Sequence, residues 1–185
     1  MAKVLVITGP SGVGKGTLIR ELLGRVSDLE LSTSATTRAP REGEQDGREY
    51  HFLSAGEFAE RADAGEFLEH ATFSGNRYGT LRSEVERCLD AGVSLVLEIE
   101  VQGARQVRAA LPERAVLIFI APPSPSVLRE RLAGRGLDSE EAIKRRLETA
   151  KQELEAQQEF KHVVVNDEVA RAAEELERIV RGELD

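Results

Sequence analysis

A glycine-rich segment follows the first apolar run of the chain and ends in Lys15-Gly16-Thr17. Residues 4–7 are apolar and mostly β-branched, which predicts a buried strand, and apolar residues recur at helical spacing from Leu18 onward. Glycines let the backbone N–H groups of the turn converge, while the helix start and the lysine add positive charge. This combination predicts a loop for the β- and γ-phosphates of a nucleoside triphosphate. The residues of the predicted phosphate loop are Gly9, Pro10, Ser11, Gly12, Val13, Gly14, Lys15, Gly16 and Thr17.

The phosphate loop departs from the usual motif at one position. The motif places Ser or Thr directly after the lysine, where the hydroxyl binds Mg²⁺, but this chain has Gly16 there and a hydroxyl only at Thr17. We therefore expect Mg²⁺ to be held mainly by phosphates and water, with Thr17, Glu98 and Glu100 as secondary candidates.

Glu98 and Glu100 follow a segment that has the composition of a buried strand. Residues two apart on a strand point the same way, and the carboxyl ends of parallel strands face the crevice in which ligands bind. Paired carboxylates at this place suit Mg²⁺ held through water, or contact with an acceptor nucleotide.

Arginines mark two further segments. Arg38 and Arg41 lie in the aperiodic stretch 36–47, and loops of this length in a compact domain are usually functional. Arg135 lies between two glycines that interrupt a helical pattern. The formal net charge of −8 argues against a nucleic-acid partner, so local positive charge suits a compact anion better than a polymer.

The order of strand-like and helical segments predicts the architecture that positions these residues. Residues 93–99 and 116–120 have the composition of buried parallel strands, and residues 102–111 form the predicted helix between them. This alternation predicts a parallel sheet with helices on both faces. Short strand-like segments between residues 34 and 80 form an inserted β-rich lobe in this interpretation.

Length and composition limit the class of protein. The 185 residues suffice for one core, and no stretch rich in Pro, Gly or Ser divides them, so we expect a single domain. No run of about eighteen apolar residues is present to span a bilayer. The first apolar run follows Met1-Ala2-Lys3 directly and predicts a core strand rather than a secretory signal, so we expect a cytoplasmic protein without a membrane partner. The single cysteine, Cys88, is predicted to pack in a helix.

The order of the motifs resembles the guanylate kinase family over nearly the whole chain. The segments that carry the resemblance are Gly9-Pro-Ser-Gly-Val-Gly-Lys15, Ser34-Ala-Thr-Thr-Arg38-Ala-Pro-Arg41-x-Gly-Glu44, Tyr50-His-Phe, Glu66-Phe-Leu-Glu69, Gly75-Asn-Arg-Tyr78-Gly79-Thr80, Glu98-Ile-Glu-Val-Gln-Gly103, Arg131-Leu-Ala-Gly-Arg135-Gly and Val165-Asn166-Asp167. The resemblance implies an α/β, three-layer P-loop NTPase fold with a parallel core sheet, a small mixed-β GMP-binding lobe and a helical lid. It implies a core at about 1–33, 81–124 and 159–185, a GMP-binding lobe at about 34–80 and a lid at about 125–158.

The resemblance also implies an activity, the ATP-dependent phosphorylation of GMP and dGMP with Mg²⁺ as cofactor, by a monomer or small homo-oligomer. Glu69 matches the position that accepts the two adjacent N–H donors of guanine, and the family usually has Asp where this chain has Glu100. The GMP-binding residues implied are Ser34, Arg38, Arg41, Tyr50, Glu69, Tyr78, Gly79, Thr80, Glu98 and Glu100. The catalytic residues implied are Lys15, Arg38 and the lid arginines Arg131, Arg135 and Arg146. Asn166 and Asp167 match positions on the adenine side of ATP, although Asp167 suits a helix cap nearly as well.

Two other functions stay open at this point. Guanylate-kinase-like domains of scaffold proteins bind phosphorylated peptides and lack catalysis, but they typically have a degraded phosphate loop, whereas Lys15 and its glycines are intact here. A kinase for another nucleoside monophosphate or for a sugar phosphate is the second alternative, because Lys15-Gly16-Thr17 also resembles adenylate kinases. Glu69 and the segment from Ser34 to Arg41 argue against it.

Overall fold

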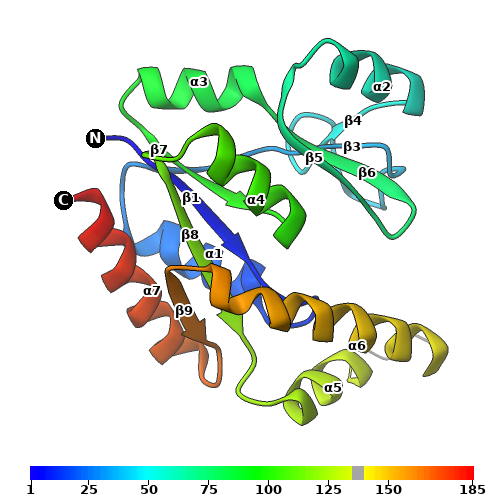
Figure 1. Cartoon of the computed structure of the whole chain (residues 1–185), viewed down its shortest axis with the longest axis vertical. Coiled ribbons are helices and arrows are strands. Elements are labelled where there is room, and N and C mark those ends of the chain that lie inside the picture. The colour runs from blue at the N-terminus through cyan, green and yellow to red at the C-terminus, as the bar shows by residue number, and fades with distance from the viewer. Residues whose placement is uncertain (135–139) are drawn as a thin grey trace.

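A computed structural model describes residues 1–134 and 140–185 of the chain. Its centre is a five-stranded sheet with the order β2-β7-β1-β8-β9, in which every neighbouring pair is parallel (Figure 1). The strands of this core sheet are β1 (Val4–Thr8), β2 (Leu29–Leu31), β7 (Ser94–Glu98), β8 (Ala115–Ala121) and β9 (His162–Val165).

Helices cover both faces of the core sheet, as the sequence predicts. The side chains of β1 alternate between the faces, and all five of its residues are buried. Leu5 and Ile7 belong to one apolar cluster, which α1 (Lys15–Arg25) and α7 (Val169–Leu184) complete. Val4 and Val6 belong to the second cluster, with α3 (Arg82–Asp90) and α4 (Val101–Ala110). Cys88 is buried in that second cluster, as predicted.

The second sheet is small and mixed, with the order β4-β3-β6-β5. Its strands are β3 (Ala35–Thr36), β4 (His51–Phe52), β5 (Phe67–Phe73) and β6 (Asn76–Leu81), and only the β3–β4 pair is parallel. The sequence predicts a strand at Phe67–Phe73 and a turn from Ser74 to Asn76, and the turn is one residue too long because β6 begins at Asn76. Tight turning is confined to Ser74 and Gly75, which have φ of 50° and 81°. The helix α2 (Ala55–Asp63) begins with the predicted capping box of Ser54 and Glu57.

Two helices project beyond the core sheet on the side away from α2 (Figure 1). They are α5 (Pro125–Ala133) and α6 (Glu140–Glu155), and their shared apolar contact joins Leu128 and Leu132 to Ala150. The predicted long helix to residue 158 ends earlier, because Ala156–Glu159 form a 3-10 turn. The predicted glycine interruption and the start of this helix at residue 138 lie partly outside the described residues.

No helix in residues 1–134 or 140–185 has the length and apolar character that crossing a membrane requires.

Candidate active site

A cleft of about 320 Å³ opens between the carboxyl ends of the core strands and the small sheet. It brings together the predicted phosphate loop and most of the residues predicted for the acceptor nucleotide. The predicted site residues that line it are Gly9, Ser11, Lys15, Ser34, Tyr50, Glu69, Tyr78, Gly79, Glu98 and Glu100. Two further charged residues line it that are not among the predicted ones, Glu49 and Glu153 of α6.

The phosphate loop has the backbone that its glycines allow. Gly9, Gly12 and Gly14 have φ of 143°, 85° and 97°, a region that residues with side chains rarely adopt. A Cβ atom on Gly9 would lie 2.2 Å from the carbonyl oxygen of Ile120, so the close approach of β8 also requires glycine. Lys15 opens α1, and its Nζ donates to the carbonyl oxygen of Gly9 at 2.6 Å. The lysine therefore lies over the loop whose phosphates it is predicted to bind.

The outer side of the phosphate loop rests on Asn166 and Arg131. The carbonyl oxygen of Val13 accepts hydrogen bonds from Asn166 Nδ2 at 2.7 Å and from the Arg131 guanidinium at 3.3 Å. Arg131 also donates to the carbonyl oxygen of Asn166 at 2.9 Å. Neither residue lines the cleft, and Asn166 is only 2% exposed. In this arrangement both side chains support the loop from behind.

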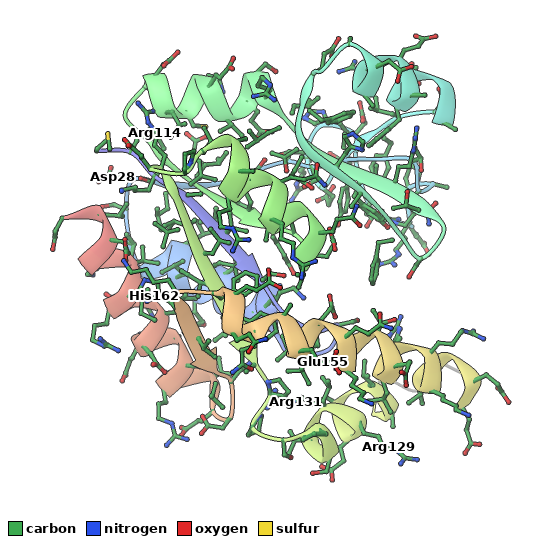
Figure 2. The ribbon with its side chains drawn as sticks, viewed as in Figure 1. Asp28, Arg114, Arg129, Arg131, Glu155 and His162 are labelled. Carbon is green, nitrogen blue, oxygen red and sulfur yellow. The ribbon has the colours of Figure 1, made fainter. Side chains whose placement is uncertain are left out.

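The other lid arginines have different positions. Arg146 is half-buried on α6, whereas Arg135 lies outside the described residues. Arg129 shares α5 with Arg131 and is exposed (Figure 2). Asp167 hydrogen-bonds the backbone N–H of Glu168 at 2.7 Å and pairs with Arg171, so its carboxylate is engaged at the start of α7.

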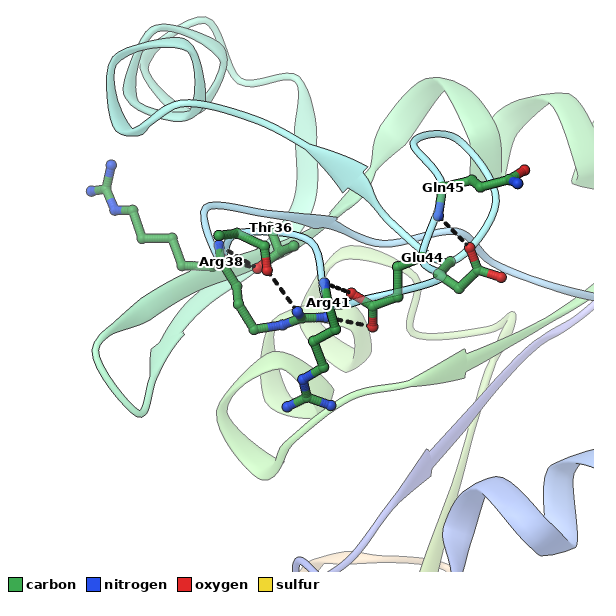
Figure 3. Close-up of polar contacts among 8 residues, drawn as sticks. Thr36, Arg38, Arg41, Glu44 and Gln45 are labelled. Atoms are coloured by element: carbon green, nitrogen blue, oxygen red, sulfur yellow. Dashed lines mark hydrogen bonds and ion pairs between the residues drawn. The ribbon is translucent and has the colours of Figure 1, made fainter.

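Glu44 fixes the two arginines of the loop that follows β3. Its Oε1 accepts from the Arg38 guanidinium at 2.9 Å, and its Oε2 accepts from the backbone N–H of Arg41 at 2.7 Å. Figure 3 shows the Arg41 guanidinium directed away from this carboxylate. Arg38 also lies over the ring of Tyr50, with its Cζ 5.3 Å from the ring centroid. Sequence reasoning gave Glu44 no role, although it closes the Arg-x-Gly-Glu turn.

The two tyrosines of the chain meet in the cleft, as their motifs predict. The ring of Tyr50 contacts that of Tyr78 edge to face, with centroids 6.1 Å apart. Burial, and then the negative charge of Glu98, raise the pKa of the Tyr50 hydroxyl above its ordinary value. Tyr50 therefore stays neutral near pH 7 and keeps a hydroxyl proton to donate.

Glu69 is a buried carboxylate in the wall that the small sheet contributes. It is 4% exposed, and its Oε1 accepts from the hydroxyl of the fully buried Thr80 at 2.7 Å. Burial raises the pKa of Glu69 to about 7, against the lowering effect of the Thr80 hydrogen bond, and the charge of Glu100 adds to the increase. A carboxylate at such a place is costly unless a ligand with N–H donors satisfies it.

Glu98 and Glu100 differ in their surroundings, contrary to the expectation that both point from one strand. The strand β7 ends at Glu98, and Glu100 is the N-cap residue of α4. The Glu100 carboxylate accepts from the backbone N–H groups of Gln102 and Gly103 at 2.8 and 2.6 Å. The cause is local, because a carboxylate before a helix start satisfies N–H groups that have no partner within the helix.

The oxygen donors beside the phosphate loop fit a hard divalent cation. A Cβ atom on Gly16 would lie 3.8 Å from Glu98 Oε2, so the absence of a side chain there leaves this carboxylate next to the residue that follows Lys15. The hydroxyl of Thr17 accepts from Arg20 at 3.3 Å. Within the described residues, no group of three or more His, Cys, Asp or Glu side chains forms a metal cage. This donor set suits a cation that keeps most of its ligands from phosphates and water.

Glu153 is a second carboxyl group in the cleft with a shifted pKa. Burial raises its pKa to about 7, while the nearby positive charge of Lys15 lowers it and Glu100 raises it. It lies on the inner side of α6, three residues from each of the buried Ala150 and Ala156. This spacing of three residues, close to one helical turn, is the signal by which sequence reasoning could have found a carboxylate facing inward.

Comparison with known proteins decides the family. The family model for guanylate kinase matches residues 1–183. The chain belongs to the guanylate kinase family. A guanylate kinase of Trichormus variabilis is 54% identical over 180 residues, which cover 97% of this chain and 90% of the relative. One of Rubrobacter xylanophilus is 52% identical over 179 residues, covering 97% and 93%.

The fold agrees with this assignment. A crystal structure of guanylate kinase from Anaplasma phagocytophilum superimposes with a TM-score of 0.82 at 35% sequence identity, covering 99% of this chain and 86% of that one. The parallel core sheet with helices on both faces and the additional small mixed sheet are therefore features of a guanylate kinase fold. The predicted α/β class is confirmed.

Proposed function

We propose that this guanylate kinase family member transfers the terminal phosphoryl group of ATP to GMP and dGMP, giving ADP and the diphosphate. The observation that carries the proposal is one cleft with two unlike walls. One wall is the phosphate loop with Lys15, and the other holds the buried acceptor Glu69 beside Tyr50 and Tyr78. A donor triphosphate and an acceptor monophosphate would thus face each other across the cleft.

Guanine is the base that the acceptor wall suits. It has adjacent N–H donors at N1 and N2, which one ionised carboxylate can accept together, whereas adenine lacks this pair. Thr80 already donates to Glu69 Oε1, so the orientation of the carboxylate is fixed before a base arrives. A site built to accept such donors discriminates strongly against a base without them, because its buried acceptor is then left unpaired.

The acceptor phosphate would be bound by charged and neutral donors held in place by protein contacts. Arg38 is oriented by Glu44 and by the ring of Tyr50, and Tyr78 contacts Tyr50 in turn. We assign Arg38, Arg41, Tyr50 and Tyr78 to the phosphate of GMP, with Ser34 and Gly79 beside the nucleoside. Arginine forks and tyrosine hydroxyls supply the bidentate and single hydrogen bonds that a phosphate accepts.

The chain needs no general base for this transfer, because the attacking phosphate is already anionic near neutral pH. Catalysis then depends on placing the phosphates in line and neutralising their charge. We assign this to Lys15, Arg38 and the lid arginines Arg135 and Arg146, whereas Arg131 would contribute through the phosphate loop that it supports. We further propose that residues 125–158 act as the lid and residues 34–80 as the GMP-binding lobe, and that their closure excludes water, which would otherwise accept the phosphoryl group.

Mg²⁺ is the cofactor that we propose for ATP, and bound Mg²⁺ would neutralise charge on the transferring phosphates. Glu98 and Thr17 are the protein groups that would contribute oxygen ligands, directly or through water. The proposed substrates are consistent with a reaction in the cytoplasm.

One assay tests the proposal directly. Purified protein and MgATP are incubated with GMP, dGMP, AMP, UMP or CMP, and release of ADP is measured. We expect GMP to give the fastest release. A rate with GMP no higher than without acceptor would contradict the proposal and favour a phosphopeptide-binding module, and a preference for AMP would favour a kinase for another nucleotide.

A further inference from the structure

Gly103 in the first turn of α4 borders the carboxylate of Glu69. A Cβ atom built on Gly103 would lie 2.4 Å from Glu69 Oε2 and 3.1 Å from its Cδ. The two residues belong to different elements, since Glu69 is on β5 and Gly103 on α4. A Cβ atom does not approach a non-bonded atom this closely in real proteins. A side chain at position 103 is therefore incompatible with the present position of the Glu69 carboxylate.

The backbone on the α4 side of this contact is fixed. The N–H of Gly103 donates to Glu100 Oε1 at 2.6 Å, and the N–H of Gln102 donates to the other oxygen of the same carboxylate. Ala104, the next residue, is fully buried in the core cluster of that face. The helix start therefore cannot retreat without losing its cap and its packing.

If position 103 carried a side chain, the Glu69 carboxylate would have to move. Its overlapping atoms are the end of a flexible side chain, held by the Thr80 hydroxyl at Oε1. A turn of the carboxylate that relieves the overlap would move both oxygens from the orientation fixed by Thr80. The backbone of Gly103 itself is helical and needs no positive φ, so alanine fits it conformationally and has the higher helix propensity.

We propose that Gly103 is a specificity-determining positioning residue, whose lack of a side chain keeps the Glu69 carboxylate in the orientation that reads guanine. This inference rests on the proposed function of Glu69. It predicts that a methyl group at position 103 impairs recognition of the base while leaving the fold and the ATP side of the cleft intact.

The test compares Gly103→Ala with Gly24→Ala in the full chain. Gly24 is also in a helix, α1, and a Cβ atom there would meet nothing within 4 Å, which makes it a matched control. We expect Gly103→Ala to raise KM for GMP by about 10-fold or more, because a misplaced acceptor leaves guanine donors unpaired. KM for ATP and Tm should stay at the values of Gly24→Ala.

A second readout separates base recognition from a general disturbance. IMP lacks the 2-amino donor of GMP, so the ratio of kcat/KM for GMP to that for IMP should fall in Gly103→Ala. The double variant Gly103→Ala/Glu69→Asp should bind GMP better than Gly103→Ala, because a carboxylate shortened by one methylene avoids the added methyl group.

Three results would overturn the inference: an unchanged KM for GMP, a parallel rise in KM for ATP, or strictly additive losses in the double variant. The wild-type reaction distinguishes this from failure of the proposed function. If wild-type protein releases no ADP in response to GMP, the proposed function itself is wrong, whatever Gly103→Ala does.

Discussion

Asn166 holds the phosphate loop by its amide nitrogen, which donates to the carbonyl oxygen of Val13 at 2.7 Å in a buried environment. Asn166 also packs closely against Gly14, the residue after Val13, since a Cβ atom on Gly14 would lie 2.5 Å from the amide nitrogen of Asn166. A loop whose N–H groups have to converge on phosphates needs its carbonyl groups held on the opposite side, and Asn166 supplies that hold.

Replacing Asn166 should therefore impair ATP binding before GMP binding. We expect Asn166→Ala to raise KM for ATP several-fold and to lower the free energy of unfolding by about 1–3 kcal/mol, because a buried carbonyl loses a donor. Asn166→Asp should be worse than alanine, since an ionised carboxylate would face the Val13 carbonyl oxygen. Equal losses of ATP and GMP affinity by calorimetry would contradict this division of the cleft.

Lys15→Ala should abolish most turnover while GMP still binds. The lysine lies at the phosphate loop and not at the acceptor wall, so its removal takes charge from the transferring phosphates. We expect kcat to fall by about 100-fold or more. Calorimetry of GMP binding to the variant is the check, and loss of GMP binding would show that the two walls are not independent.

Glu44 should matter for the acceptor phosphate through the arginines that it orients. Glu44→Ala removes the partner of the Arg38 guanidinium and of the Arg41 N–H, so KM for GMP should rise. Binding of guanosine, which lacks the phosphate, should change little. Glu42→Ala is the matched control, because Glu42 is an exposed carboxylate in the same loop. An equal loss of guanosine affinity would place the defect at the base instead.

The pKa of Glu69 makes GMP binding depend on pH. Burial raises this pKa to about 7, and guanine donors require the ionised form, so base binding should weaken as pH falls below about 7. Binding should release protons, which calorimetry in buffers of different ionisation enthalpy measures. Guanosine is the ligand of choice because the phosphate of GMP titrates in the same range. Glu69→Gln should show no such dependence and should weaken GMP more than ATP.

The same shift has the opposite consequence for stability. The native state binds a proton on Glu69 more tightly than the unfolded chain, so stability is highest below pH 4.5 in this respect and falls as pH rises to about 7. The difference corresponds to roughly 3 kcal/mol at about 1.4 kcal/mol per pKa unit. Glu69→Gln should accordingly be more stable than wild type at pH 8 and similar to it at pH 5, as urea unfolding would test.

The sequence predicts best those structural elements that are determined by residues close together in the chain. The strand, turn and helix around Lys15 follow one another directly, and the capping box of Ser54 and Glu57 spans one helical turn. The alternation of apolar strands and helices was sufficient for the core sheet. The role of Glu100 as a helix cap was not predicted, because the residues after Glu98 could either extend the strand or start a helix. The hydrogen bonds of the Glu100 carboxylate to the first N–H groups of α4 favour the helix.

Contacts between distant segments are what the sequence could not supply. Val13 and Asn166 are separated by 153 positions. Gly103 comes close to the Glu69 carboxylate only because α4 packs beside β5. The hairpin of β5 and β6 was only partly predicted. The polar residues Asn76 and Arg77 give β6 no strand-like sequence pattern at its start, and its pairing with β5 is what stabilises it.

The position of β1 in the core sheet also constrains how the chain is made. The middle strand β1 is synthesised before both of its neighbours, which residues 94–98 and 115–121 supply. One edge of β1 therefore stays open until residues 94–98 are made and the other until residues 115–121 are made, and an open apolar edge can pair with other chains. A nascent chain that ends before β8 would expose this strand edge together with a phosphate loop that lacks its hydrogen bond from Asn166.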